Sequence, residues 1–274
     1  MKKNRFLLSE TVLQTLDPAP PALAIHAQKT YVDSMASTIY ALYQTQRAYR
    51  YQSLSTDNPL SDSLSDRPLP ALTHADLDFA RTHILDRYHA GLEAHRRRPQ
   101  TFPALHYPLS SSDITTLRKQ GGAFINIPAA NGSTPESKNP FFRKSDVRLS
   151  KVRLFLPGIA TKSGFLLASL THQGSETFVD ENDASFTFYH KPITVDFKYR
   201  TSDLKYGEDV PNTIEGEIGL SIKDATVEDH ENGFANVGPF TMWHASIKGN
   251  EGLDWTACKG GYLEFEGHFM PFPG

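Results

Sequence analysis

The second half of the chain, from Phe124 to Phe272, alternates short apolar and polar runs that are separated by Gly, Pro and Asn. This pattern is typical of antiparallel strands joined by tight turns. The predicted strands are Ala123–Ile127, Val147–Leu156, Phe165–Thr171, Glu176–Val179, Ser185–Tyr189, Ile193–Tyr199, Thr213–Ile222, Phe240–Ile247 and Tyr262–Phe269. So many short strands without a helix-length gap predict a two-sheet antiparallel β-sandwich that is jelly-roll-like.

The alternation is interrupted in the strand Val147–Leu156. Val147 and Leu149 keep one phase, Val152 and Leu154 keep the other, and the phase changes at Ser150-Lys151. One extra residue in a strand shifts the phase in this way, so the sequence predicts a β-bulge there.

Two stretches before residue 100 instead repeat apolar residues at the three- and four-residue spacing of a helix face. The first runs from His26 to Leu54, and its stripe consists of Tyr31, Met35, Thr38, Leu42, Thr45 and Tyr49. The second begins at Thr73, which can cap the helix together with Asp76, and ends at Arg96-Arg97-Arg98. Ser110–Gln120 predicts a short third helix, and Ser53–Pro70 a loop.

These patterns predict an α+β chain in three parts. Residues 1–25 form a linker or arm around the cluster Asp17-Pro18-Ala19-Pro20-Pro21, residues 26–122 a helical segment with a helical hairpin, and residues 123–274 the β-sandwich. The proline-rich start leaves two readings open, namely an ordinary terminus and the end of a longer polypeptide.

Composition excludes several classes of protein. The net charge of −3, from 28 basic and 31 acidic residues, gives no overall field that would attract nucleic acid. One cysteine, Cys258, cannot form a disulfide framework. The apolar run Phe6-Leu7-Leu8 is too short for a signal peptide, and no stretch approaches a membrane span. We therefore expect synthesis in the cytoplasm without a signal peptide, with release, if any, as part of a complex.

Candidate catalytic groups are few. His172, His190, His230, His244 and His268 fall one to a segment, so a metal site requires them to converge in space. The pairs Glu215/Glu217 and Glu264/Glu266 have the ~6.6–7 Å separation of strand neighbours, which suits an inverting glycosidase and also an ordinary solvent face. The run Glu228–Gly233 can offer oxygen ligands to calcium, but we interpret it as a turn. We predict no catalytic residue, no metal and no cofactor.

Aromatic residues are better candidates for binding. Trp243, Trp255, Tyr206 and Phe234 lie in loops or near strand ends, where rings serve as anchors for protein partners or as platforms for sugars. The same rings could also fill the core. The tyrosines at the end of the first helix, including Tyr49 and Tyr51, are interpreted as packing residues rather than as a stacking platform.

The end of the chain resembles a known family. The segment Gly238–Ile247, the loop Gly252–Trp255 and the strand Gly261–Phe269 resemble the closing segment of the large A subunits of Tc-type insecticidal toxin complexes. Asp146–Gly158 and Ile125–Pro128 look like earlier strands of that module, and the helix Ala36–Leu54 is similar to the helices that precede it. The similarity covers about half of the chain.

The resemblance implies a non-enzymatic module that docks the next toxin component, with no catalytic residues to carry over. Pore formation is not implied, because one short hairpin stands where the family has a long helical shaft. We therefore predict a binding or assembly module of a toxin-like complex, as part of a larger polypeptide or a homo-oligomer. A carbohydrate-binding module is the alternative, and a glycoside hydrolase or metal-dependent hydrolase is a remote one.

Overall fold

The computed structural model describes residues 21–65, 71–94, 99–129, 139–201, 236–249 and 252–271. It divides into two units. The first comprises Met1–Arg50 and Asp57–Ala90, and the second comprises Tyr51–Thr56 and Gly91–Gly274. We call them the helical unit and the β unit. The predicted boundary at residue 123 differs from this division, because a strand and a helix that precede residue 123 belong to the β unit.

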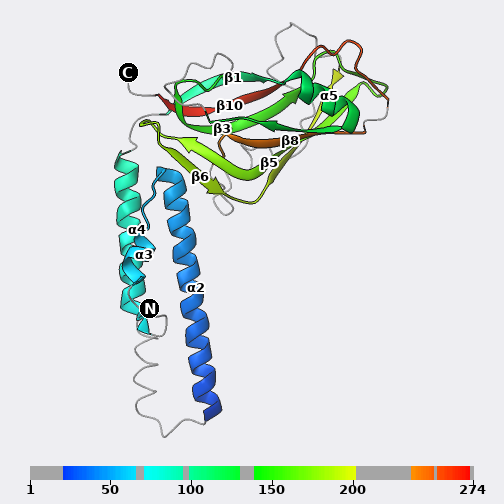
Figure 1. Ribbon diagram of the computed structural model, residues 1–274. Coiled ribbons are helices and arrows are strands. Elements are labelled where there is room, and N and C mark those ends of the chain that lie inside the picture. The colour runs from blue at the N-terminus through cyan, green and yellow to red at the C-terminus, as the bar shows by residue number, and fades with distance from the viewer. Residues whose placement is uncertain are drawn as a thin grey trace. The chain divides into compact units, whose positions relative to one another are not determined.

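The helical unit contains α2 (Pro21–Ser53), α3 (Pro59–Leu64) and α4 (His74–Ala94). The last residues of α2, from Tyr51 onward, belong to the β unit. The helices pack side by side on a small core (Figure 1). Its buried residues are Met35, Leu42, Leu60, Leu72, Leu77, Ala80 and Ile84. The predicted stripe of the first helix is thus buried at Met35 and Leu42, whereas Tyr31 is 44% exposed.

Local signals explain the ends of these helices. The Asp76 carboxylate accepts a hydrogen bond from the Thr73 backbone N–H at 2.8 Å, as the predicted cap requires. The short helix α3 lies in the predicted loop, where Pro59 occupies its first turn without losing a helical hydrogen bond. Arg96-Arg97-Arg98 and residues 1–20 lie outside the described residues.

The β unit contains two larger antiparallel sheets (Figure 1). Sheet A has the order β1-β10-β3, from β1 (Gln100–Pro108), β10 (Tyr262–Pro271) and β3 (Lys144–Phe155). Sheet B has the order β2-β8-β5-β6, from β2 (Gly122–Asn126), β8 (Thr241–Lys248), β5 (Phe165–Val179) and β6 (Ser185–Tyr189), and β7 (Ile193–Arg200) also pairs with β5. The short strands β4 (Ala160–Thr161) and β9 (Leu253–Asp254) form a separate pair.

Most predicted strands are present, with four differences, one of which is that the two-residue strands β4 and β9 were not predicted. The predicted strands Phe165–Thr171 and Glu176–Val179 are one strand, β5. Strand β1 was not predicted, since Pro103 interrupts its sequence and an internal proline argues against a strand. The predicted strand Thr213–Ile222 lies outside the described residues. The chain is therefore α+β with antiparallel sheets, while the jelly-roll connectivity stays a prediction.

The predicted bulge in β3 is confirmed. Lys151 pairs with Glu266 of β10 and Leu149 pairs with Gly267, so Ser150 is the extra residue between two consecutive partners. The short helix is also confirmed as α5 (Ser111–Gln120), with a capping box between Ser110 and Asp113.

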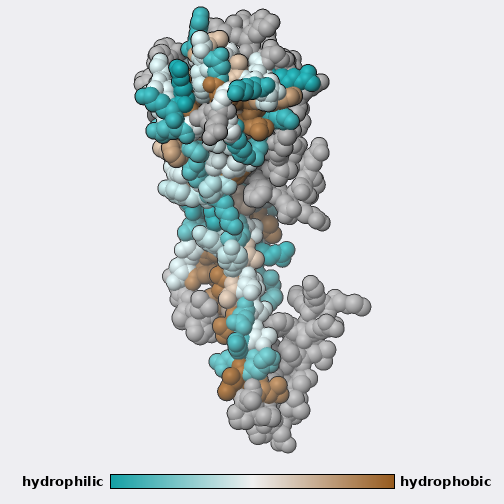
Figure 2. All heavy atoms as spheres, turned by 90° about the vertical axis from the view of Figure 1, so that its right-hand side faces the viewer, coloured by the Kyte–Doolittle hydropathy of each residue, from teal (hydrophilic) through white to brown (hydrophobic). Residues whose placement is uncertain are grey.

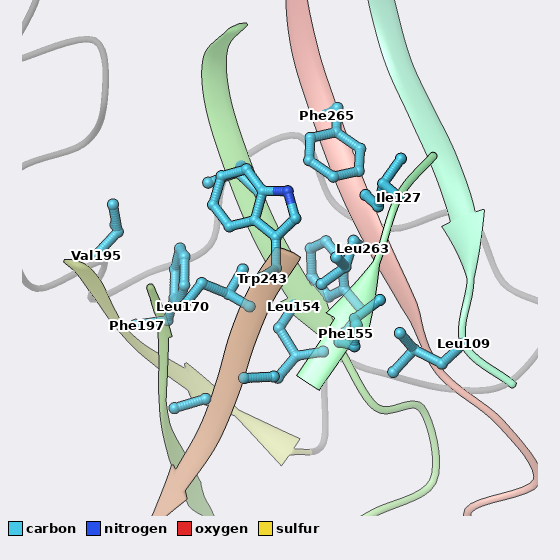
Figure 3. Packing of buried hydrophobic residues seen from close by; sticks show 14 of the residues in the cluster. Leu109, Ile127, Leu154, Phe155, Leu170, Val195, Phe197, Trp243, Leu263 and Phe265 are labelled. Carbon is cyan, nitrogen blue, oxygen red and sulfur yellow. The ribbon is translucent and has the colours of Figure 1, made fainter. Parts of the chain in front are cut away.

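The two sheets share one apolar core. Trp243 of β8 points toward β10, where Leu263 and Phe265 lie, and Leu170 of β5 is beside it (Figure 3). The indole N–H of Trp243 donates to the carbonyl of Pro239 at 3.0 Å, so the buried ring leaves no polar atom without a partner. This packing holds the inner faces of both sheets and leaves the opposite face of sheet B for other contacts.

Candidate functional site

The structure corrects the expected exposure of two predicted binding residues. Trp243 is 0% exposed and Trp255 is 8% exposed, and both belong to the core of the β unit. Burial of a large ring removes apolar surface from water, and this is the core-filling alternative that the sequence left open. Tyr206 and Phe234 lie outside the described residues.

Exposed apolar side chains instead lie on the outer face of sheet B. Phe124 is 60% exposed and Met242 is 47% exposed, whereas their chain neighbours Ile125 and Trp243 are buried, as alternation along a strand requires. The Phe124 ring lies 4.6 Å from the His244 ring, its partner on β8.

The register places the exposed residues of β2 and β8 in two adjacent rows of one face, because Phe124 pairs with His244 whereas Met242 pairs with Asn126. Met242 lies between Trp243 and Thr241, which pair with His172 and Glu176 of β5, so it faces the intervening residues of β5. One of those residues, Ser175, pairs with Tyr189 of β6, which is 68% exposed. We call Phe124, Met242, His244 and Tyr189 the outer-face row.

Elsewhere this outer face carries paired polar groups together with Leu167, a 42% exposed apolar residue opposite Lys248 of β8. Cross-strand hydroxyl pairs join Ser169 to Ser246 at 2.7 Å and Thr171 to Thr194 at 2.9 Å. The charged groups Lys248 and Asp196 lie 2.8 Å apart. On the described surface turned toward the viewer in Figure 2, apolar residues form small separate areas among hydrophilic ones.

A second candidate site is buried beneath sheet B. We call His172, Glu176 and His190 the His–Glu centre; its ligand-type atoms lie within 4.8 Å of one another. Residues four apart in a regular strand are ~13 Å apart, so His172 and Glu176 should not meet. They meet because three residues of β5 stand between them where β8 has one, which is a bulge.

Gly174 makes this bulge possible. Its φ is +83°, and a Cβ atom would lie 2.2 Å from the carbonyl oxygen of His190. The backbone N–H of His190 donates to the Gly174 carbonyl at 2.7 Å, which fixes the junction of β6 and β7 against β5. Only glycine fits this conformation and this close approach.

The Glu176 carboxylate has four polar neighbours. Oε1 accepts a hydrogen bond from the Tyr51 hydroxyl at 2.8 Å and lies 3.3 Å from His190 Nε2. Oε2 accepts the backbone N–H of Gly238 at 2.5 Å and lies 3.5 Å from His172 Nε2. Burial alone would raise the pKa of Glu176, but these imidazole and backbone groups lower it to about 2, so the carboxylate is ionised.

Tyr51, at the end of α2, is fixed by a second set of contacts. The Arg148 guanidinium donates from Nη2 to the Tyr51 carbonyl at 2.8 Å and lies 4.6 Å from the centre of the Tyr51 ring. Arg148 Nε also donates to Asp146 at 2.6 Å, so the cation is paired. Burial and the neighbouring Glu176 charge raise the pKa of Tyr51, which keeps its hydroxyl protonated as a donor.

The hydrogen bonds argue against a metal ion in the His–Glu centre. The Gly174 backbone N–H donates to His172 Nδ1 at 3.1 Å. A neutral imidazole that accepts at Nδ1 carries its proton at Nε2, so His172 has no lone pair to offer there. Only Glu176 and His190 remain, which is fewer than the three protein ligands of a zinc site. Within the described ranges the centre is the one group of three potential ligands.

The carboxylate pair Glu264/Glu266 also has a structural partner. Arg153 Nη2 contacts both carboxylates, and the distance to Glu266 is 2.8 Å. Glu264 is 3% exposed and also lies 2.9 Å from His106 Nε2. An arginine that contacts both carboxylates gives the pair a role in holding β3 against β10. Glu215, Glu217 and the run Glu228–Gly233 lie outside the described residues.

The remaining candidates do not converge on the His–Glu centre. His244 stacks on Phe124 in the outer-face row, and burial lowers the pKa of His268. Burial raises the pKa of the Cys258 thiol, which donates to the Gly260 carbonyl at 3.4 Å. A protonated thiol is a poor nucleophile.

Sequence reasoning named His172 and His190 but missed Glu176 and Tyr51. A glutamate inside a predicted strand beside two histidines was a usable signal, because buried carboxylates require partners. The bulge that joins them was hidden, since Gly174 was interpreted as a turn between two strands.

No protein-family model and no curated protein matches this chain. Within the residues that the structure describes, no helix is long and apolar enough to cross a membrane. The function is therefore argued from the two sites above.

Proposed function

We propose that the chain is a non-enzymatic binding module that docks a protein partner through the outer face of sheet B. The observation that carries this proposal is the outer-face row, with Phe124 and Met242 exposed on a sheet whose opposite face is buried. Exposed apolar side chains surrounded by polar ones are typical of protein interfaces.

The polar groups favour a protein over a glycan. Sugar hydroxyls need free donors and acceptors, but Ser169, Ser246, Thr171 and Thr194 already bond across the strands in pairs. The charged groups Lys248 and Asp196 likewise pair with each other. The carbohydrate-binding alternative thus has less support than a protein partner.

The resemblance of Gly238–Ile247 to Tc-type A subunits supports the further proposal that the partner belongs to a toxin-like complex. A jelly-roll-like connectivity of the two sheets, and release of the chain as part of that complex, belong to the same proposal.

The test compares Phe124→Ser/Met242→Ser with the matched control Phe79→Ser, since Phe79 on α4 is 63% exposed. Proteins that the wild type captures from the producing cells are identified, purified and titrated against each of the three chains. We expect one purified partner to bind the wild type and Phe79→Ser equally and the double variant at least ~10-fold more weakly.

A glycan array with the same three chains tests the alternative. Glycan binding that is lost only in the double variant would establish the carbohydrate reading. Equal binding of the purified partner by all three folded chains would show that the outer-face row does not bind this partner. Melting curves confirm that each chain is folded.

A further inference from the structure

The hydrogen bonds of the His–Glu centre assign its protons. His172 accepts at Nδ1 from Gly174, so its Nε2 carries a proton toward Glu176. His190 Nδ1 lies 2.6 Å from the carbonyl oxygen of Lys191. A carbonyl oxygen can only accept, so His190 donates from Nδ1.

The second nitrogen of His190 determines the charge of the centre. Its Nε2 is buried and lies 3.3 Å from Glu176 Oε1. If His190 Nε2 carries a lone pair, it and the Glu176 carboxylate oxygen are two electron-rich atoms that face each other. The protein interior screens their repulsion poorly. With a second proton, the contact becomes an ion pair between an imidazolium and a carboxylate.

The same carboxylate holds two other segments of the β unit. Its oxygens accept hydrogen bonds from Tyr51, in the last turn of α2, and from Gly238, which precedes β8. Tyr51 also packs edge-on against Phe178 and Phe188, with ring centres 5.4 and 5.1 Å away. A Glu176 side chain that changes position would therefore disturb both segments.

We propose that the His–Glu centre is a pH-sensitive lock, in which the charge on His190 fixes the Glu176 carboxylate and, through it, Tyr51 and Gly238. Loss of that proton as the pH rises turns an attraction into a repulsion and loosens both segments. This inference is independent of the proposed function of the outer face.

Other charged or hydrogen-bonding groups face the centre from each neighbouring element. From β5 come His172 and the ionised Glu176; from β3 come Arg148 and Asp146, which pair with each other; from α2 comes the protonated Tyr51. The backbone around Gly238 offers an N–H donor only. Imidazole is the side chain that ordinarily changes charge between pH 5 and 8, so His190 is the group to follow.

The first experiment is NMR of the full chain with 15N-labelled histidine from pH 5.5 to 8.5. We expect one ring to carry two protons at low pH and to lose one as the pH rises, together with a change at the Tyr51 ring. This ring is assigned to His190 through its stacking on His172, with centres 4.7 Å apart. The proposal fails if His190 carries a single proton throughout, or if its titration leaves Tyr51 unchanged.

Melting curves give a second readout. The charged form stabilises the folded state, so the melting temperature should fall by roughly 2–6 °C as the pH rises through the titration. Glutamine is a permanent neutral donor, so His190→Gln should flatten this dependence, whereas the control His268→Gln should retain it. If His190→Gln does not fold, the NMR titration of the wild type still tests whether His190 loses a proton and whether Tyr51 responds.

Zinc ions test the competing reading. We expect Zn²⁺ at pH 8 to leave the wild-type melting temperature unchanged, because His172 offers no lone pair. An increase of several degrees that His190→Gln abolishes would identify a metal site and overturn the lock.

Discussion

At the scale of single residues, Glu176 shows how a buried charge is accommodated. An unpaired carboxylate in the interior would be strongly unfavourable, but this one faces Tyr51, Gly238 and two imidazoles. Its ionised form is therefore part of the folded state, and removing any partner should have a measurable effect.

Glu176 should contribute to acid unfolding. Its pKa is about 2 in the folded chain and 4.5 without its partners, so about 3 kcal/mol of stability is present above pH 4.5 and is lost as the pH falls toward 2. Urea unfolding between pH 7 and 2 should show a shallower acid slope for Glu176→Gln. Asp196→Asn, which removes one partner of the exposed Lys248–Asp196 pair, should keep the wild-type slope and change the stability by less than ~1 kcal/mol. Equal slopes for all three chains would contradict the assignment.

The residues of the two candidate sites differ in how well they could be predicted from the sequence. Trp243 was found by type but placed wrongly, because a ring beside a turn is equally compatible with an exposed anchor and with a core residue. Phe124 was inside a predicted strand, and the face that it occupies depends on which side the second sheet covers. The contact of Glu176 with His172 depends on the bulge in β5, and that bulge is visible only in the pairing of β5 with β8.

At the scale of elements, the bulge in β5 depends on one glycine. Gly174→Ala should destabilise the β unit by at least ~2 kcal/mol, because a Cβ atom 2.2 Å from the His190 carbonyl cannot be accommodated without moving the backbone. Gly164 is the control, since its φ is +74° but a Cβ atom there would meet no other group within 4 Å. Gly164→Ala should cost only ~1 kcal/mol. Chemical denaturation of both variants measures the difference, and similar losses would argue against the close approach at Gly174.

The cap of α5 is a second test at this scale. Ser110 Oγ accepts the Asp113 backbone N–H at 3.1 Å, so Ser110→Ala should cost ~1 kcal/mol in chemical denaturation. Ser111→Ala, one position inside the helix, should change the stability by a few tenths of a kcal/mol. A smaller loss for Ser110→Ala than for Ser111→Ala would contradict the cap.

Elements were predicted best where the pattern depends on neighbours in the sequence. The capping box of α5 and the bulge at Ser150 both follow from a few consecutive residues. Strand β1 was missed because its pairing with β10 joins residues more than 150 positions apart, and Pro103 obscures its alternation. Long-range pairing is the information that a single sequence does not display.

At the scale of the whole molecule, the two units have cores of very different size. Among the described residues, the helical unit buries seven in its cluster, whereas the β unit buries Trp243, Phe265 and many others in one continuous core. Stability need not be uniform across such a chain, and the smaller core should open first.

Hydrogen exchange should resolve this difference. We expect amides of α2 and α4 to exchange faster than those of β8 and β10. Ile84 is 0% exposed, and Ile84→Ala should cost ~2–5 kcal/mol within the helical unit and speed its exchange further. Exchange of β8 and β10 should remain as in the wild type; uniform acceleration in both units would instead indicate one cooperative molecule.

The single thiol offers a practical consequence. Cys258 is half-buried, is hydrogen-bonded to Gly260 and resists ionisation, so thiol-directed dyes and spin labels should attach to it slowly. A cysteine introduced at an exposed position in each unit would react first, with the natural residue left in place. The chain is thus suited to site-selective labelling, which would allow the distance between its two units to be measured spectroscopically in solution.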